Sequence, residues 1–255
     1  MRPRTLLLSA ALIVGTTAAV ADEPIRQPVD LALVLLTDVS KSVDNREYEM
    51  VKEGYKAAFA DPQVLEAILK NSRGVAVAYV EFSGKDEFTV VKGWDLLTDA
   101  ASARSFGEAV AIAPRSSSGS TALAISLKKA ADMLTADAAG AARRVIDVAS
   151  DHPNDDGRSG PVRDAAVAAG ITINALPIIE ANRMVPYDGH LTYAVQQWGF
   201  EDPVAFYRNH VVGGPGSFLI EVRDYVAFGE ALKRKLLREL ISGEDDKSGT
   251  LASAD

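Results

Sequence analysis

The segment Val29–Leu36 constrains the fold most, because its residues are apolar with almost no interruption. A strand with one solvent-exposed face alternates apolar and polar residues, whereas a strand buried on both faces of a parallel sheet does not. Three later segments, Val75–Phe82, Arg144–Ala149 and Ile171–Ile178, have similar apolar character and are separated by amphipathic stretches. Parallel strands need long crossover connections, so this order predicts βα units. We expect an α/β fold with a doubly wound, mostly parallel sheet and helices on both faces.

The stretches between these strands carry helix signals. Asp44 and Glu47 form the pattern of a capping box, and apolar residues follow at helical spacing until Asp61-Pro62 ends the helix. Further helices are predicted at Val64–Leu69, Ala100–Ile112, Thr121–Leu134, Pro161–Ala169 and Tyr225–Leu240, with helical parts over His190–Arg208. The sequence therefore predicts one domain over residues 29–241.

Two shorter strands complete the predicted sheet. Glu87–Val91 follows the turn Ser83-Gly84 and is expected to form a short antiparallel edge strand. Phe218–Val222 is expected to be a last strand. The glycine-rich run Gly213–Gly216 precedes that strand instead of opening a helix, which favours a turn over a phosphate-binding loop.

The first 21 residues have the character of a signal peptide. Arg2 and Arg4 form a basic start, Leu6–Val20 is mostly apolar, and Ala19-Val20-Ala21 has the small-x-small pattern of a cleavage site. An uncleaved membrane anchor is the alternative, but the stretch is short for a span. We therefore expect cleavage before Asp22, a lead-in over 22–28, a flexible tail over 242–255, and no membrane span in the mature chain. The expected location is periplasmic or secreted.

Composition narrows the function classes. The chain has no cysteine, which excludes a disulfide framework and thiolate chemistry. Its formal net charge is −8, and the sequence contains no long run of basic residues. A nucleic-acid-binding surface needs concentrated positive charge, so nucleic acid is not an expected partner.

Three polar loops are expected at the carboxyl edge of the sheet, where open α/β sheets bind ligands. They contain Asp38-Val39-Ser40-Lys41-Ser42, then Ser118-Gly119-Ser120-Thr121, and then Ser150-Asp151-His152. Apart from His152, their side chains offer oxygen ligands, which suit Mg²⁺, Mn²⁺ or Ca²⁺. Each loop also has a simpler interpretation, since Ser42, Asp44 and Thr121 could cap helices and Asp151 could begin a turn.

These motifs resemble the metal-ion-dependent adhesion site of von Willebrand factor type A domains. The resemblance covers residues 29–240, and stretches such as V-A-Y-V-E-F-S-G and R-R-V-I-D-V-A-S-D are similar to a bacterial subfamily of exported single-domain proteins of uncharacterised function. It implies a Rossmann-like fold and a divalent cation, Mg²⁺ first, with Mn²⁺ or Ca²⁺ as alternatives. The implied metal-site residues are Asp38, Ser40, Ser42, Thr121 and Asp151. Ser40 and Ser42 would bind the ion directly, Thr121 directly or through water, and the two aspartates largely through water.

The resemblance further implies a non-enzymatic domain that binds a protein partner, whose Asp or Glu carboxylate would complete the metal's coordination. A metal-assisted hydrolase using the same acidic site is the alternative, since a bound divalent ion can activate water. His152 is the one residue near the motif that could serve as its general base. The chain lacks the nucleophile elbow, the P-loop and the dinucleotide fingerprint.

Overall fold

The structure is a computed structural model that describes residues 24–152, 158–179, 184–187, 190–193 and 202–241. The predicted signal peptide at 1–21 and the predicted tail at 242–255 lie outside the described residues. No helix in the described part is long and apolar enough to cross a bilayer.

The central feature is a five-stranded sheet in the order β3-β2-β1-β4-β5. Its strands are β1 (Leu31–Asp38), β2 (Val75–Phe82), β3 (Phe88–Leu97), β4 (Arg143–Ser150) and β5 (Ile171–Pro177). All neighbouring pairs are parallel except β2 and β3. All eight residues of β1 are buried, which confirms the expected burial on both faces.

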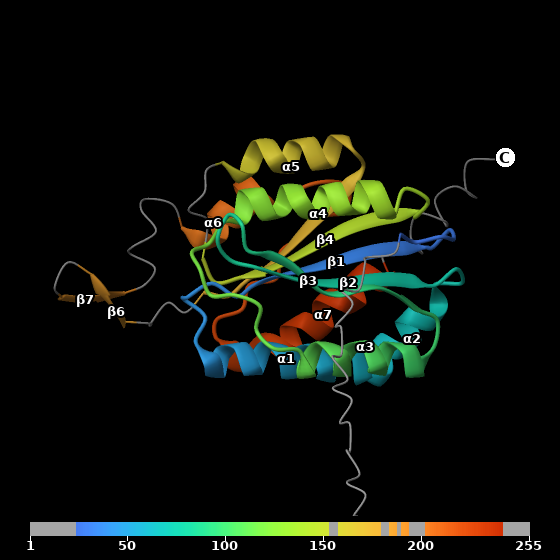
Figure 1. Cartoon of the computed structure of the whole chain (residues 1–255), viewed down its shortest axis with the longest axis horizontal. Coiled ribbons are helices and arrows are strands. Elements are labelled where there is room, and N and C mark those ends of the chain that lie inside the picture. The colour runs from blue at the N-terminus through green and yellow to red at the C-terminus, as the bar shows by residue number, and fades with distance from the viewer. Residues whose placement is uncertain (1–23, 153–157, 180–183, 188–189, 194–201, 242–255) are drawn as a thin grey trace, which may run out of the picture.

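Helices cover both faces of the sheet (Figure 1). One layer contains α1 (Asn45–Ala60), α2 (Pro62–Lys70), α3 (Ala100–Ile112) and α7 (Phe228–Ile241). The opposite layer contains α4 (Leu123–Asp137) and α5 (Ser159–Ala168). The predicted capping box is present at the start of α1, where Glu47 N donates to Asp44 Oδ1 over 2.8 Å and Asp44 N donates to Glu47 Oε2 over 2.6 Å.

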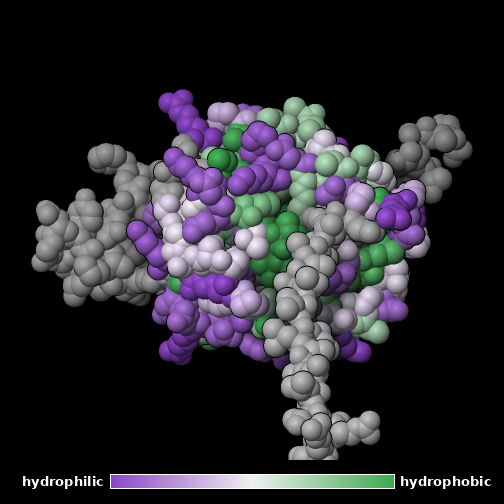
Figure 2. Space-filling view, viewed as in Figure 1, coloured by the Kyte–Doolittle hydropathy of each residue, from purple (hydrophilic) through white to green (hydrophobic). Residues whose placement is uncertain are grey.

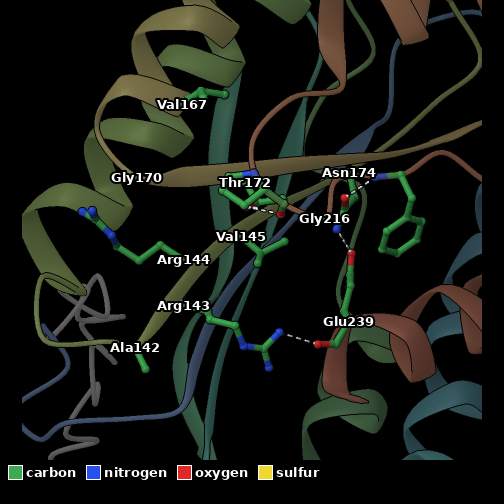
Figure 3. A pocket seen from close by; sticks show the side chains of 12 residues that line it. Ala142, Arg143, Arg144, Val145, Val167, Gly170, Thr172, Asn174, Gly216 and Glu239 are labelled. Atoms are coloured by element: carbon green, nitrogen blue, oxygen red, sulfur yellow. Dashed lines mark hydrogen bonds between the residues drawn. The ribbon is translucent and has the colours of Figure 1, made fainter. Parts of the chain in front are cut away.

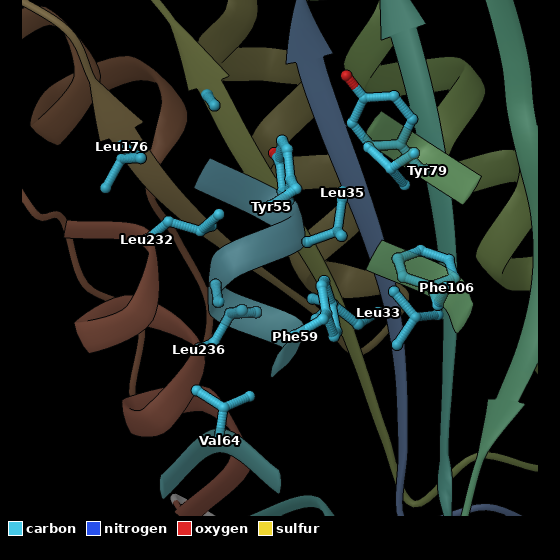
Figure 4. Close-up of a cluster of buried hydrophobic side chains, with 14 of the residues drawn as sticks. Leu33, Leu35, Tyr55, Phe59, Val64, Tyr79, Phe106, Leu176, Leu232 and Leu236 are labelled. Carbon is cyan, nitrogen blue, oxygen red and sulfur yellow. The ribbon is translucent and has the colours of Figure 1, made fainter. Parts of the chain in front are cut away.

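The period-two geometry of β1 divides the core between the two layers. Leu33 and Leu35 face the α1 and α7 side, where they belong to the cluster shown in Figure 4 with Tyr55 and Phe59. Val34 and Leu36 point to the α4 side and join a second cluster. Because both faces of β1 are covered, its two ends are the parts of the strand that can present polar groups to a ligand.

The edge strand β3 is longer than the predicted Glu87–Val91, since it spans ten residues. Its register against β2 shifts between Val77 and Tyr79 and again between Tyr79 and Val80. These irregularities break the period-two pattern that sequence analysis relies on. The strand is antiparallel and lies at the edge, as expected.

The side of the molecule drawn in Figure 2 has apolar surface in its middle, while hydrophilic side chains cover much of the rest.

The predictions for the last third of the chain need one addition and one correction. His190–Arg208 is helical in part, as expected, but it begins with β7 (His190–Tyr193), which pairs with β6 (Met184–Tyr187) in an antiparallel hairpin that was not predicted. Helical structure is described only from α6 (Pro203–Phe206), which continues as a π-helix over Tyr207–Val211. A short run of strand-forming residues in a mostly helical pattern gives no clear period of its own.

Phe218–Val222 is not a continuous strand. It lies parallel to β5 and forms two isolated bridges, Ala175 with Leu219 and Ile178 with Val222. A short 3₁₀ helix, Tyr225–Ala227, then leads into α7.

Candidate metal centre

The three predicted loops meet at the carboxyl edge of the sheet. β1 ends at Asp38 and its neighbour β4 ends at Ser150, so these loops start side by side. Backbone hydrogen bonds join the first loop to the one that precedes α4, because Lys41 N donates to Gly119 O over 2.9 Å. Ala122 N likewise donates to Ser83 O over 2.7 Å, which ties the α4 loop to the end of β2. The loop positions are therefore set by main-chain contacts.

Four of the five predicted residues form a chain of hydrogen bonds through their side chains. Thr121 Oγ1 donates to Ser40 Oγ over 3.1 Å, and Ser40 Oγ lies 3.0 Å from Ser42 Oγ. Ser42 Oγ donates to Asp151 Oδ1 over 2.8 Å. Ser40, Thr121 and Asp151 are buried. Residues 109 positions apart in the sequence thus form one compact group of oxygen atoms.

The fifth residue, Asp38, is buried beside this group. Its Oδ1 accepts from Ser40 N over 2.8 Å, and its Oδ2 accepts from Ser150 Oγ over 2.6 Å. Burial raises the pKa of Asp38 to about 7, the nearby Asp151 carboxylate adds to the increase, and the hydrogen bonds from Ser150 and Ser40 oppose it. Asp38 has no ion pair within the described part of the chain. A cation bound here would favour the ionised form of this carboxyl group.

The structure rules out two simpler interpretations of the motif. Asp44 caps α1, so Ser42 does not. The helix expected to begin at Thr121 begins at Leu123, and its N-cap residue Ala122 has no side-chain capping bond. The hydroxyl groups of Ser42 and Thr121 point instead into the cluster.

Arg115 holds the first loop in place, and sequence analysis did not identify it. Its Nη2 lies 2.8 Å from the carbonyl oxygens of Val39, Ser40 and Val43, and its Nε donates to Ser117 O over 3.0 Å. The guanidinium also lies over the ring of Tyr48, with Cζ 5.4 Å from the ring centroid. A single arginine in a serine-rich loop gives no sequence signal, because its partners are main-chain oxygens.

Glu87 and Ser83 support the loop that carries Thr121. Glu87 Oε2 accepts from Ser83 Oγ over 2.7 Å and from Gly84 N over 2.9 Å. Ser83 Oγ also accepts from Gly119 N over 3.1 Å. The hydrogen bonds from Ser83, Gly84 and Gly119 lower the pKa of Glu87. A Cβ atom on Gly119 would lie 1.9 Å from Glu87 Oε2, so the loop approaches this carboxylate too closely for a side chain at 119.

His152 follows the site on the chain and is anchored by its main chain. Its carbonyl oxygen accepts from Tyr207 OH over 2.6 Å and from Ser150 Oγ over 2.9 Å. Its Nδ1 atom is buried. A role for the imidazole at a bound ion, or as a general base, stays a prediction.

The donor set fits a hard divalent cation, because two carboxylates balance its charge and three hydroxyls add neutral oxygen ligands. The described residues contain no group of three or more His, Cys, Asp or Glu side chains that could hold a metal, so a metal at this edge would depend on the three hydroxyls as well as on the two acids. The carboxyl edge of β1 and β4 is therefore the candidate metal centre of this chain.

The sheet order and the antiparallel edge strand give the chain the fold of von Willebrand factor type A domains (Figure 1). The chain belongs to the family described as "Protein of unknown function (DUF1194)", whose model matches residues 28–244. No curated protein sequence matches the chain.

Several solved structures share the fold at low sequence identity. The pilus adhesin SpaC from Lactobacillus rhamnosus GG is 16% identical, with a TM-score of 0.57 over 86% of this chain and 31% of that one. A von Willebrand factor type A protein from Catenulispora acidiphila is 14% identical, with a TM-score of 0.54 over 83% of this chain and 43% of that one. Proximal thread matrix protein 1 from the mussel byssus, described with a zinc-occupied MIDAS motif, is 15% identical. Its TM-score is 0.54 over 82% of this chain and 45% of that one. The chain spans less than half of each of these structures.

Proposed function

We propose that the protein is an exported, divalent-metal-dependent protein-binding domain. Asp38, Ser40, Ser42, Thr121 and Asp151 would hold the ion, with Mg²⁺ as the first choice and Mn²⁺ or Ca²⁺ as alternatives. The observation that carries this proposal is the cluster itself: two buried acids and three hydroxyls within hydrogen-bond contact, assembled from three separate loops.

The charged and the neutral residues of the site would bind the ion in different ways. Both oxygens of Asp38 already accept hydrogen bonds from Ser40 N and Ser150 Oγ, which favours an indirect role for this carboxylate through water. The hydroxyls of Ser40, Ser42 and Thr121 are the neutral donors, and each can turn its lone pairs inward by rotating one O–H bond. When bound, the ion would supply an electrophilic position open to an oxygen from outside the chain.

A carboxylate from a partner protein suits that position. Neutral hydroxyl ligands leave more positive charge on an ion than a cage of carboxylates does. The chain carries a formal net charge of −8, so an acidic partner surface is repelled at long range unless the ion bridges the two at short range. The similarity to a pilus adhesin supports a role in protein binding. A hydrolase at the same site would instead require turnover of a substrate.

Metal-dependent thermal stability tests the site. An ion bound only by the folded state at about 100 times its Kd adds about 2.7 kcal/mol, which is about 5–10 °C in Tm for a domain of this size. We expect this gain with Mg²⁺ or Mn²⁺, and its loss in Asp38→Ala and in the Ser40→Ala, Ser42→Ala double variant. Ser116→Ala, an exposed serine in the neighbouring loop, is the matched control and should keep the gain. A wild-type Tm that does not respond to metal would contradict the site assignment.

Capture experiments test the function. Binding of a partner from a periplasmic extract should be lost with chelator, with Thr121→Ala or Asp151→Ala, and with one acid-to-amide change in the partner. A partner that stays bound in excess chelator would disprove carboxylate bridging even if the ion binds. Export is tested separately by intact mass, which should place the mature N-terminus at Asp22. Retention of Arg2 and Arg4 on the extracted protein would contradict cleavage.

A further inference from the structure

A cavity lies at the opposite end of the sheet from the candidate metal centre. It has a volume of about 670 Å³ and is bounded by the first residues of β4 and β5, the end of α5, the loop at 215–218 and Glu239 of α7. Figure 3 shows Arg144 reaching toward Gly170 and Arg143 reaching toward Glu239, with Thr172 and Asn174 of β5 close by. Cavities of this size hold small organic ligands.

The glycine-rich run creates this cavity. Gly213 pairs antiparallel with Ile173, whereas Leu219 pairs parallel with Ala175, so the chain reverses direction between the two bridges. Gly214 and Gly216 allow the reversal with φ angles of +95° and +67°. A Cβ on Gly214 would also lie 2.9 Å from Thr172 Cα. Gly214 therefore lies directly against the backbone of β5, and Pro215 and Gly216 beyond it line the cavity.

Side chains replace the missing strand contacts at this edge. Thr172 Oγ1 donates to Pro215 O over 3.3 Å, and Asn174 Oδ1 accepts from Phe218 N over 2.9 Å. These bonds fix the loop as one wall of the opening. The cavity is thus held open by specific contacts.

The walls combine apolar surface with positive charge. Val145, Val167 and Phe218 supply apolar side chains, and Arg143 and Arg144 supply two guanidinium groups. Glu239 is the one acid among the lining residues that the structure describes, and its Oε1 accepts from Lys235 Nζ over 2.7 Å and from Asn174 Nδ2 over 2.9 Å. Lys235 also pairs with the buried Asp147, so Glu239 keeps part of its negative charge beside Arg143, and Arg144 is the lining arginine that makes no ion pair among the described residues.

Both arginines are partly tethered by main-chain carbonyls. Arg143 Nη1 donates to Glu239 O over 2.7 Å, and Arg144 Nη2 donates to Ala169 O. The Arg144 guanidinium is thus fixed at the cavity wall, where its remaining N–H groups can bind an anion.

We propose that this cavity binds a small organic carboxylate with an apolar body. The carboxylate would be bound by the Arg144 guanidinium, and the apolar body would contact Val145, Val167 and Phe218. The site is independent of the proposed metal centre, so its occupancy should not change with chelator.

Titration of the full chain with hexanoate tests this proposal, with hexanamide as the neutral probe of the same shape. Amide NMR signals of Gly170, Thr172 and Gly216 should shift saturably with hexanoate, and hexanamide should bind at least about tenfold more weakly, because a charged hydrogen bond is lost. Arg144→Gln should weaken hexanoate by about tenfold or more, and Val167→Phe should weaken both probes by filling the cavity. Arg104→Gln, an exposed arginine on α3, is the matched control and should bind hexanoate normally.

A valine tripeptide with a free carboxyl end distinguishes the source of the carboxylate. Tighter binding than hexanoate assigns the site to peptide chain ends, and weaker binding assigns it to free acids. Equal affinity for hexanoate and hexanamide, an unchanged hexanoate affinity in Arg144→Gln, or no saturable shift of these signals would overturn the proposal.

Discussion

Replacement of Arg115 by Gln should loosen the first loop of the candidate metal centre. The two hydrogens on Arg115 Nη2 are shared among the carbonyl oxygens of Val39, Ser40 and Val43. Arg115 Nε donates a hydrogen bond to Ser117 O. The substitution therefore removes about three charge-assisted bonds, each with a net value of about 1.5–3 kcal/mol when its partner is buried. Arg115 is only partly buried, so water replaces some of the loss. We expect a net cost of about 2–4 kcal/mol.

The loss should appear in both stability and metal affinity. Urea unfolding of the metal-free protein measures the first, and calorimetric titration with Mn²⁺ or Mg²⁺ measures the second. Because Arg115 binds the carbonyl of Ser40 and those of its neighbours, a looser loop should lower ion affinity by about tenfold or more. Arg115→Lys keeps the charge but not the planar fork, and should fall between wild type and Arg115→Gln.

Two outcomes would refute this reasoning. A change in unfolding free energy below about 0.5 kcal/mol would show that the bonds seen here do not restrain the loop. A clear loss of stability with unchanged ion affinity would show that the loop holds its position without Arg115. The exposed Arg104→Gln controls for loss of positive charge and should leave both measurements unchanged.

Three further predictions follow from buried or crowded groups. Lys235→Met should lower the free energy of unfolding in urea by about 3–5 kcal/mol, because it leaves the buried carboxylates of Asp147 and Glu239 without their shared cation. The exposed Lys56→Met is the control. A loss below about 1 kcal/mol in Lys235→Met would contradict the reasoning. Burial and the Glu239 charge raise the pKa of Asp147 from 3.8 to about 7, so the folded state binds its proton more tightly. Stability of the metal-free protein should therefore fall by roughly 2 kcal/mol or more between about pH 5.5 and 7.5, and Asp147→Asn should reduce the slope measured by thermal unfolding. Gly119→Ala should cost about 1–3 kcal/mol by forcing Glu87 away, and Glu87→Ala in the same chain should recover part of the loss in Tm.

The parallel core of the fold could be predicted because burial on both faces leaves a strong signature. Val29–Leu36 and Val75–Phe82 are short, mostly apolar runs, Arg144–Ala149 keeps four apolar residues around Asp147, and each segment contains most of the strand that it predicts. The edges were harder to predict. β3 has exposed and half-buried residues and a shifted register, and the chain at 218–222 bonds to β5 only in places. Edge segments are shaped by tertiary contacts that leave no periodic pattern.

The same contrast holds at the site. Asp38, Ser40, Ser42, Thr121 and Asp151 could be predicted to lie together, since parallel strands and short loops bring their carboxyl ends to one edge. Whether they bind metal is a separate question that the titrations address. The contacts of Arg115 and Ser150 could not be predicted. Arg115 binds main-chain oxygens, which every residue has, and Ser150 reaches Asp38 only after the chain has folded. Ser150 Oγ meets Asp38 across 112 residues, and Arg115 meets carbonyls more than 70 residues away.

The direction of the hydroxyl hydrogen bonds bears on how an ion would enter the site. Ser42 donates to Asp151, so Ser40 is left to donate to Ser42 and Thr121 donates to Ser40, which gives a one-way chain that ends on a carboxylate. Coordination requires the lone pairs of these oxygens to face the ion, so the hydrogens must rotate away while the heavy atoms can stay in place. Each hydrogen bond lost costs only about 1 kcal/mol, whereas moving loops tied by main-chain bonds would cost more. If the proposed site binds an ion, the heavy atoms can stay where they are, and the affinity should depend chiefly on the charges of Asp38 and Asp151.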